Sequence, residues 1–81
     1  MRVNVKVFAQ LRDALGTGDM PVELNDGATV KDVWQALVAA HPDLARFESS
    51  VSCAVNATYA RKHTHVNAGD EVAFLPPVSG G

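Results

Sequence analysis

The sequence has little of what marks secreted, membrane or nucleic-acid-binding proteins. Its single cysteine, Cys53, cannot form a disulfide within the chain, which favours a reducing compartment. No apolar run approaches the ~18 residues of a membrane span, and the first residues lack the apolar core of a signal peptide. Lys and Arg number 7 against 9 Asp and Glu, so there is no basic excess to attract nucleic acid. We therefore expect a cytoplasmic protein with neither a membrane nor a nucleic-acid partner.

Equipment for independent catalysis is also sparse. The sequence shows no Ser/His/Asp triad, no phosphate-binding loop and no pair of carboxylates at catalytic spacing. His63 and His65 provide only two potential metal ligands, fewer than a zinc site needs. Cys53 shares a strand face with Val51 and Val55, which favours a small buried side chain over a nucleophile. We predict no bound cofactor and no metal site in this chain.

What is present is a globular composition with 47% hydrophobic and 20% charged residues. A chain of 81 residues supports one domain. Pro76 and Pro77 lack the N–H groups that a sheet requires, so the last strand should end before them. We predict a domain over residues 1–75 and an extended tail over residues 76–81.

Alternating apolar residues predict strands over residues 3–9, 20–24, 51–57 and 71–75. Asn56-Ala57-Thr58 also suits a turn, followed by a short strand near Tyr59. Residues 10–15 have helical spacing and stop at Gly16. The main helix begins after Thr29, a candidate N-cap with Asp32 at N3, and ends near His41 because Pro42 follows. Its apolar face consists of Val30, Val33, Trp34, Leu37 and Val38.

This order of elements predicts an α+β fold, the ubiquitin-like β-grasp. A mixed sheet should carry one main helix across one face, with the first and last strands adjacent and parallel, followed by a flexible C-terminal Gly-Gly tail. Strand alternation then places Phe8 and Leu75 on the face away from the helix, where Tyr59 is a candidate third member. Such an exposed apolar patch marks an interface, unless one of the three folds under a loop and joins the core.

The C-terminal Gly80 and Gly81 add no side-chain bulk and accept almost any backbone conformation. They form a slim strap that can enter a narrow channel and present its terminal carboxylate there. The alternative is an ordinary frayed terminus or a cloning remnant.

Three segments resemble the small, sulfur-carrying subunit of molybdopterin synthase: Phe8-Ala9-Gln10-Leu11-Arg12, Ala54-Val55-Asn56, and Gly69 through Gly81 with its Pro-Pro-Val-Ser-Gly-Gly end. The resemblance implies that an activating enzyme adenylates Gly81 with ATP and that a sulfur donor converts it to a thiocarboxylate. The sulfur would then pass to cyclic pyranopterin monophosphate in the large subunit, which Gly80 helps the tail to enter. The implied complex is a heterotetramer of two small and two large subunits, contacted through Phe8, Tyr59, Leu75, Pro76, Pro77 and Val78.

Three alternatives remain open. The sulfur carrier of thiamine synthesis has the same fold and the same Gly-Gly end, and a ubiquitin-like modifier would join Gly81 to a lysine. A ubiquitin-like interaction domain without tail chemistry is the third.

Overall fold

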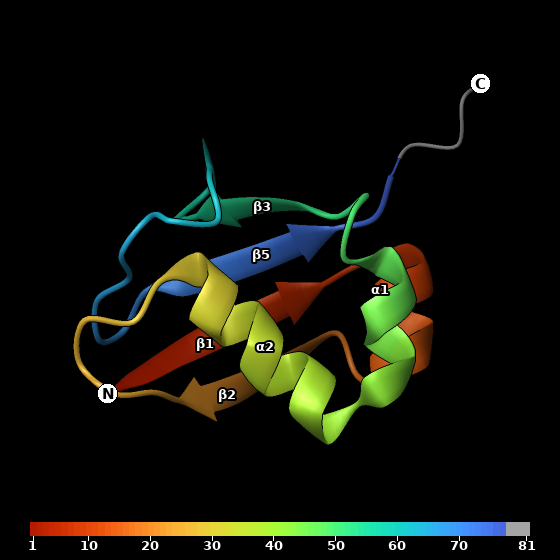
Figure 1. The fold of residues 1–81 in the computed structure, drawn as a ribbon, viewed down its shortest axis with the longest axis horizontal. Coiled ribbons are helices and arrows are strands. Elements are labelled where there is room, and N and C mark those ends of the chain that lie inside the picture. The colour runs from red at the N-terminus through yellow and green to blue at the C-terminus, as the bar shows by residue number, and fades with distance from the viewer. Residues whose placement is uncertain (78–81) are drawn as a thin grey trace.

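A computed structural model describes residues 1–77, and residues 78–81 lie outside the described part. Five strands and three helical segments follow one another within residues 1–77 (Figure 1). Their bounds are β1 Arg2–Val7, α1 Ala9–Leu15, β2 Asp19–Glu23, α2 Val30–Ala40, the 3-10 helix η1 Pro42–Phe47, β3 Ser52–Val55, β4 Thr58–Ala60 and β5 Glu71–Leu75.

The strands form one mixed sheet in the order β2-β1-β5-β3-β4. β1 and β5 are parallel neighbours in its centre, although they come from opposite ends of the chain, and the remaining pairs are antiparallel. α2 lies across one face of the sheet, as Figure 1 shows. The predicted β-grasp, with its first and last strands side by side, is confirmed.

α2 is the element whose local signals are clearest. The Thr29 N–H donates to Asp32 Oδ2 at 2.8 Å, and the Asp32 N–H donates to Thr29 Oγ1 at 3.4 Å, which closes a capping box. The helix ends at His41, whose N–H donates to the Leu37 carbonyl at 2.8 Å, directly before Pro42. The predicted N-cap and C-terminal end are therefore confirmed.

Two predicted strands were too long. β1 ends at Val7 rather than residue 9, because Ala9 has a φ of 48°, which turns the chain out of the strand and into α1. β3 ends at Val55 rather than residue 57, because Asn56 and Ala57 have φ values of 50° and 70°. Positive φ at both central residues is the geometry of a two-residue hairpin turn, which joins β3 to β4.

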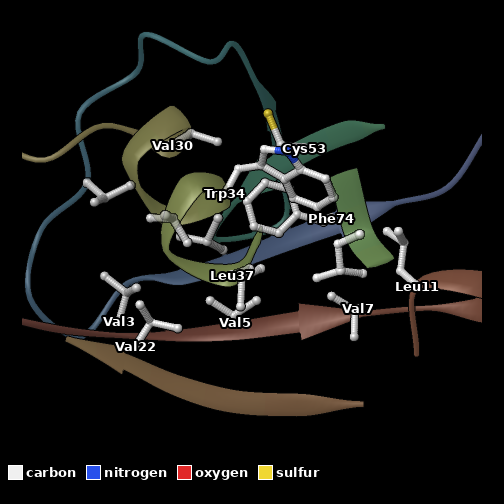
Figure 2. Close-up of a cluster of buried hydrophobic side chains, with 14 of the residues drawn as sticks. Val3, Val5, Val7, Leu11, Val22, Val30, Trp34, Leu37, Cys53 and Phe74 are labelled. Atoms are coloured by element: carbon white, nitrogen blue, oxygen red, sulfur yellow. The ribbon is translucent and has the colours of Figure 1, made fainter. Parts of the chain in front are cut away.

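The core lies between α2 and the sheet (Figure 2). Val3, Val5 and Val7 of β1 point into it, and the rings of Trp34 and Phe74 meet with centroids 5.1 Å apart. Leu44 of η1 closes one end and is fully buried. Among residues 1–77, none of the helices combines the length and the apolar character of a membrane span.

Candidate functional site

The face of the sheet opposite α2 carries the residues predicted to form an interface. Val7 and Phe74 are register partners, and both are buried under the helix. The residues that follow them, Phe8 and Leu75, continue the alternation and point to the other face, since Phe8 has extended backbone angles. Phe8 is 45% exposed and Leu75 is half-buried. The structure thus places Leu75 at the end of β5 and Phe8 directly after the end of the adjacent β1, with the same outward direction.

Tyr59 lies on the same face but in a neighbouring row. The register aligns Tyr59 with Ala54, Ala54 with Ala73, and Ala73 with Lys6. Two strand spacings, about 10 Å, therefore separate the Tyr59 backbone from β5. Tyr59 is 80% exposed, whereas Ala54 beside it is buried. Small alanines form the centre of this face, and larger apolar side chains flank it. We call five of its residues the outer patch: Phe8, Ala54, Tyr59, Ala73 and Leu75.

An ion pair and a hydrogen-bonded turn border the outer patch. Lys6 Nζ lies 3.4 Å from Glu71 Oε2. Asn56 Nδ2 donates to Asp70 Oδ1 at 3.0 Å, and the Glu71 N–H donates to Asn56 Oδ1 at 2.9 Å. These bonds tie the β3–β4 turn to the start of β5, and so they fix the hairpin that carries Tyr59.

Asp70 is held as a carboxylate by this arrangement. The Asn67 N–H donates to Asp70 Oδ2 at 2.8 Å, and together with the Asn56 amide it lowers the pKa of the Asp70 carboxyl below its usual value. The charged form of Asp70 is thus the one that secures the turn.

The chain leaves the sheet beside Phe8. β1 and β5 are parallel, so their C-terminal ends lie at the same edge, where β5 ends at Leu75. Figure 1 shows the chain departing there, at the end of the sheet near α1. Pro76 is half-buried and Pro77 is exposed. Val78, Gly80 and Gly81, and with them the predicted mobile tail, lie outside the described residues.

The other candidate side chains have structural roles or stand apart. Cys53 is 7% exposed, and its thiol donates a hydrogen bond to the Ala60 carbonyl at 3.0 Å. Burial raises the pKa of the thiol, and the positive charge of Lys62 lowers it by less. His65 Nδ1 lies 3.0 Å from the Gly27 carbonyl oxygen, so this residue joins two loops. Over residues 1–77, no three His, Cys, Asp or Glu side chains gather into a group that could hold a metal ion.

Sequence reasoning missed two parts of the site. The alternation of β3 and β5 contained the signal for Ala54 and Ala73, but small residues give little reason to expect a surface. The bonds of Asn56 with Asp70 and Glu71 span 14 and 15 residues, and no local pattern encodes such a contact.

Comparison with known proteins identifies the family of this chain. The profile of the ThiS family matches residues 5–81. This chain belongs to the ThiS family. The molybdopterin synthase sulfur carrier subunit of Chlamydomonas reinhardtii is 37% identical over 83 residues, with all of both chains covered. The subunit of the same name from Escherichia coli (strain K12) is 39% identical over 82 residues, covering 98% of this chain and 99% of the relative.

Solved structures agree with this ThiS-family assignment. SAMP1 from Haloferax volcanii superposes with a TM-score of 0.90 at 35% identity, with all of both chains covered. A chain in the crystal structure of the Amycolatopsis orientalis BexX/CysO complex superposes with a TM-score of 0.72 at 29% identity, covering 98% of this chain and 99% of that one. The same fold therefore also occurs in a chain that was solved as part of a protein complex.

Proposed function

We propose that this ThiS-family protein is the sulfur carrier subunit of molybdopterin synthase. The observation that carries the proposal is full-length similarity, at 37% and 39% identity, to two relatives with that name. The Gly80-Gly81 end after Pro76-Pro77 supports it, because an unbranched C-terminus is what a threaded, reactive carboxylate requires.

The chemistry runs through the Gly81 carboxyl group. Its carboxylate attacks the α-phosphate of ATP in an activating enzyme, which releases pyrophosphate and leaves an acyl adenylate. A sulfur donor then displaces AMP and yields a thiocarboxylate. Its sulfur passes to cyclic pyranopterin monophosphate in the large subunit, and two such transfers form the dithiolene. ATP and the catalytic side chains belong to the partners, and this chain contributes the reacting terminus and its positioning.

The outer patch is the surface that positions the terminus. Phe8 and Leu75 lie where the chain leaves the sheet, so a large subunit that covers them also receives Pro76, Pro77 and Val78. A few residues, often aromatic ones, carry most of the affinity of a protein interface, and Phe8 and Tyr59 are the exposed aromatic residues of this surface. Two small and two large subunits form the proposed assembly.

The test is the intact mass of the chain after incubation with the activating enzyme, ATP and a sulfur donor. We expect the oxygen-to-sulfur increase on the full chain and none on a chain that lacks Gly81. A chain lacking Gly81 that still gains sulfur would contradict the proposal. Transfer to the pyranopterin substrate, rather than to a thiazole precursor, then separates this function from thiamine synthesis.

A ubiquitin-like modifier is the second candidate, because small archaeal modifier protein 1 of Haloferax volcanii is 36% identical over 84 residues. In that case Gly81 would form an isopeptide bond with a lysine. Conjugates of higher mass that resist reducing denaturation, and that require Gly81, would favour this candidate.

A further inference from the structure

A groove of about 550 Å³ lies on the helix side of the molecule, away from the outer patch. It runs between the first turns of α2 and the segment that follows β4. Two backbone bonds join these walls: the Val30 N–H donates to the Thr64 carbonyl and the Lys31 N–H to the Lys62 carbonyl, both at 2.9 Å. Figure 1 shows this segment passing beside the start of α2.

The walls of this groove are basic. Lys31, Lys62 and His63 line it, and the exposed Arg61 directly precedes Lys62. The bond between the Lys31 and Lys62 backbones brings both lysines to the same stretch of wall. The acidic residue that lines the groove is Glu48. The chain as a whole has a net charge of −2, so this concentration of positive charge is local.

Three other cations have partners within residues 1–77, whereas Arg12 on α1, like the cations at the groove, forms no ion pair there. Arg2 pairs with Glu23 at 2.7 Å, Lys6 pairs with Glu71, and the Arg46 guanidinium lies 4.9 Å from the centre of the Phe47 ring. Within residues 1–77, neither Lys31, Arg61 nor Lys62 forms an ion pair. Lys62 Nζ donates to the Glu48 backbone carbonyl at 3.2 Å, which holds it at the groove and leaves its other two N–H donors available.

We propose that this groove binds an acidic segment of a partner protein. Its cations match carboxylates, and the exposed Gln35 amide in the lining can bond to a peptide backbone. Trp34 also lines the groove, but at 3% exposed it forms part of the floor rather than an open contact surface. A volume of about 550 Å³ exceeds what a single small anion fills and lies within the ~300–1,000 Å³ range of ligand sites.

This inference goes beyond the proposed function. The groove lies on the α2 side, whereas the outer patch occupies the opposite face and the tail leaves from the end of β5. A partner can therefore occupy the groove while the large subunit or the activating enzyme holds the outer patch.

The test uses the full chain and an octaglutamate peptide as the probe, followed by amide chemical shifts. We expect saturable binding with the largest shifts at residues 29–35, 48 and 61–63, weakening as salt is added. Lys31→Glu and Lys62→Glu should each weaken binding roughly three- to tenfold. Arg12→Glu is the matched control, since it makes the same charge change on α1 and should leave the affinity unchanged.

Three results would overturn the proposal. Equal weakening by Arg12→Glu would mean diffuse attraction rather than a site. Inorganic phosphate that produces the same shifts and displaces the peptide at equal concentration would mean a simple anion site. Concentration-dependent self-association with shifts at the same residues would assign the groove to a second copy of the chain.

Discussion

Single polar residues determine where the outer patch is placed. Asn56 and Ala57 adopt positive φ, which costs non-glycine residues free energy and requires compensation. The Asn56 side chain provides it, by donating to Asp70 and accepting from the Glu71 N–H. The orientation of the Tyr59 hairpin therefore depends on two side chains that do not belong to the patch.

Asp70→Ala should lower the free energy of unfolding by about 1 kcal/mol at pH 7, because both hydrogen bonds to its carboxylate are lost. The pKa of Asp70 is lower in the folded state, so its contribution is present above the usual value of 3.8 and disappears as the pH falls through the folded value. Urea unfolding at several pH values should show that the difference in free energy of unfolding between wild type and variant becomes smaller below about pH 4. Asp13→Ala, at an exposed site on α1, is the control, and a gap that stays constant with pH would contradict this role.

Cys53 tests whether sulfur chemistry is confined to the terminus. Its thiol is buried and donates a hydrogen bond to the Ala60 carbonyl, and burial raises its pKa. The thiol is therefore a poor nucleophile. Cys53→Ala should leave the extent of sulfur loading unchanged while costing about 1 kcal/mol of stability. Intact-mass measurement of loading and a urea melt check the two parts separately. Loss of loading in a variant that remains folded would show that the thiol takes part.

At the scale of elements, the parallel pair β1 and β5 joins the fold to the function. Each strand presents one face to α2 and the other to the outer patch, and each ends at the edge where the tail departs. The helix side is stabilised by burial of Val5, Val7 and Phe74, so the opposite face is free to remain apolar and exposed.

Phe8→Glu should weaken association with the large subunit by at least ~2 kcal/mol, about thirtyfold, because a charge would be buried in the centre of the contact. Leu75→Glu should also weaken the association. Because Leu75 is half-buried, thermal melting must show that this variant is still folded. Titration calorimetry measures the affinity. Ala39→Glu places the same charge on the exposed side of α2 and should have no effect, so equal losses in both variants would refute the interface.

The elements that the sequence predicted best were those with short-range signals. The N-cap Thr29 with Asp32 at N3 and the end of α1 at Gly16 are each encoded within a few residues, and the structure has both. Strand ends were predicted less well, since Ala9 fits an alternating pattern as readily as a helix start. Contacts that depend on the folded sheet, such as Asn56 with Asp70 or Lys31 with Lys62, leave no local pattern to find.

Considered as a whole, the molecule separates stability from reactivity. Within the described residues, 1–77, the hydrophobic core lies between positions 1 and 74, and the strands end at Leu75. Gly81 follows six positions later in the sequence. Changes at the C-terminus should therefore alter chemistry without altering the fold.

Adding one glycine after Gly81 tests most directly whether a change at the C-terminus alters the chemistry and leaves the fold intact. The extra residue moves the carboxylate by up to about 3.3–3.6 Å, and a misplacement of even ~1 Å can cost two orders of magnitude in rate. Sulfur loading, measured by intact mass, should be abolished while the melting temperature stays that of the wild type. Gly80→Leu should also fail to load, because a channel shaped for glycine excludes a branched side chain. Normal loading of the lengthened chain would mean that the activating enzyme does not select the position of the carboxylate, and the threading of the tail would have to be abandoned as the reason for its two glycines.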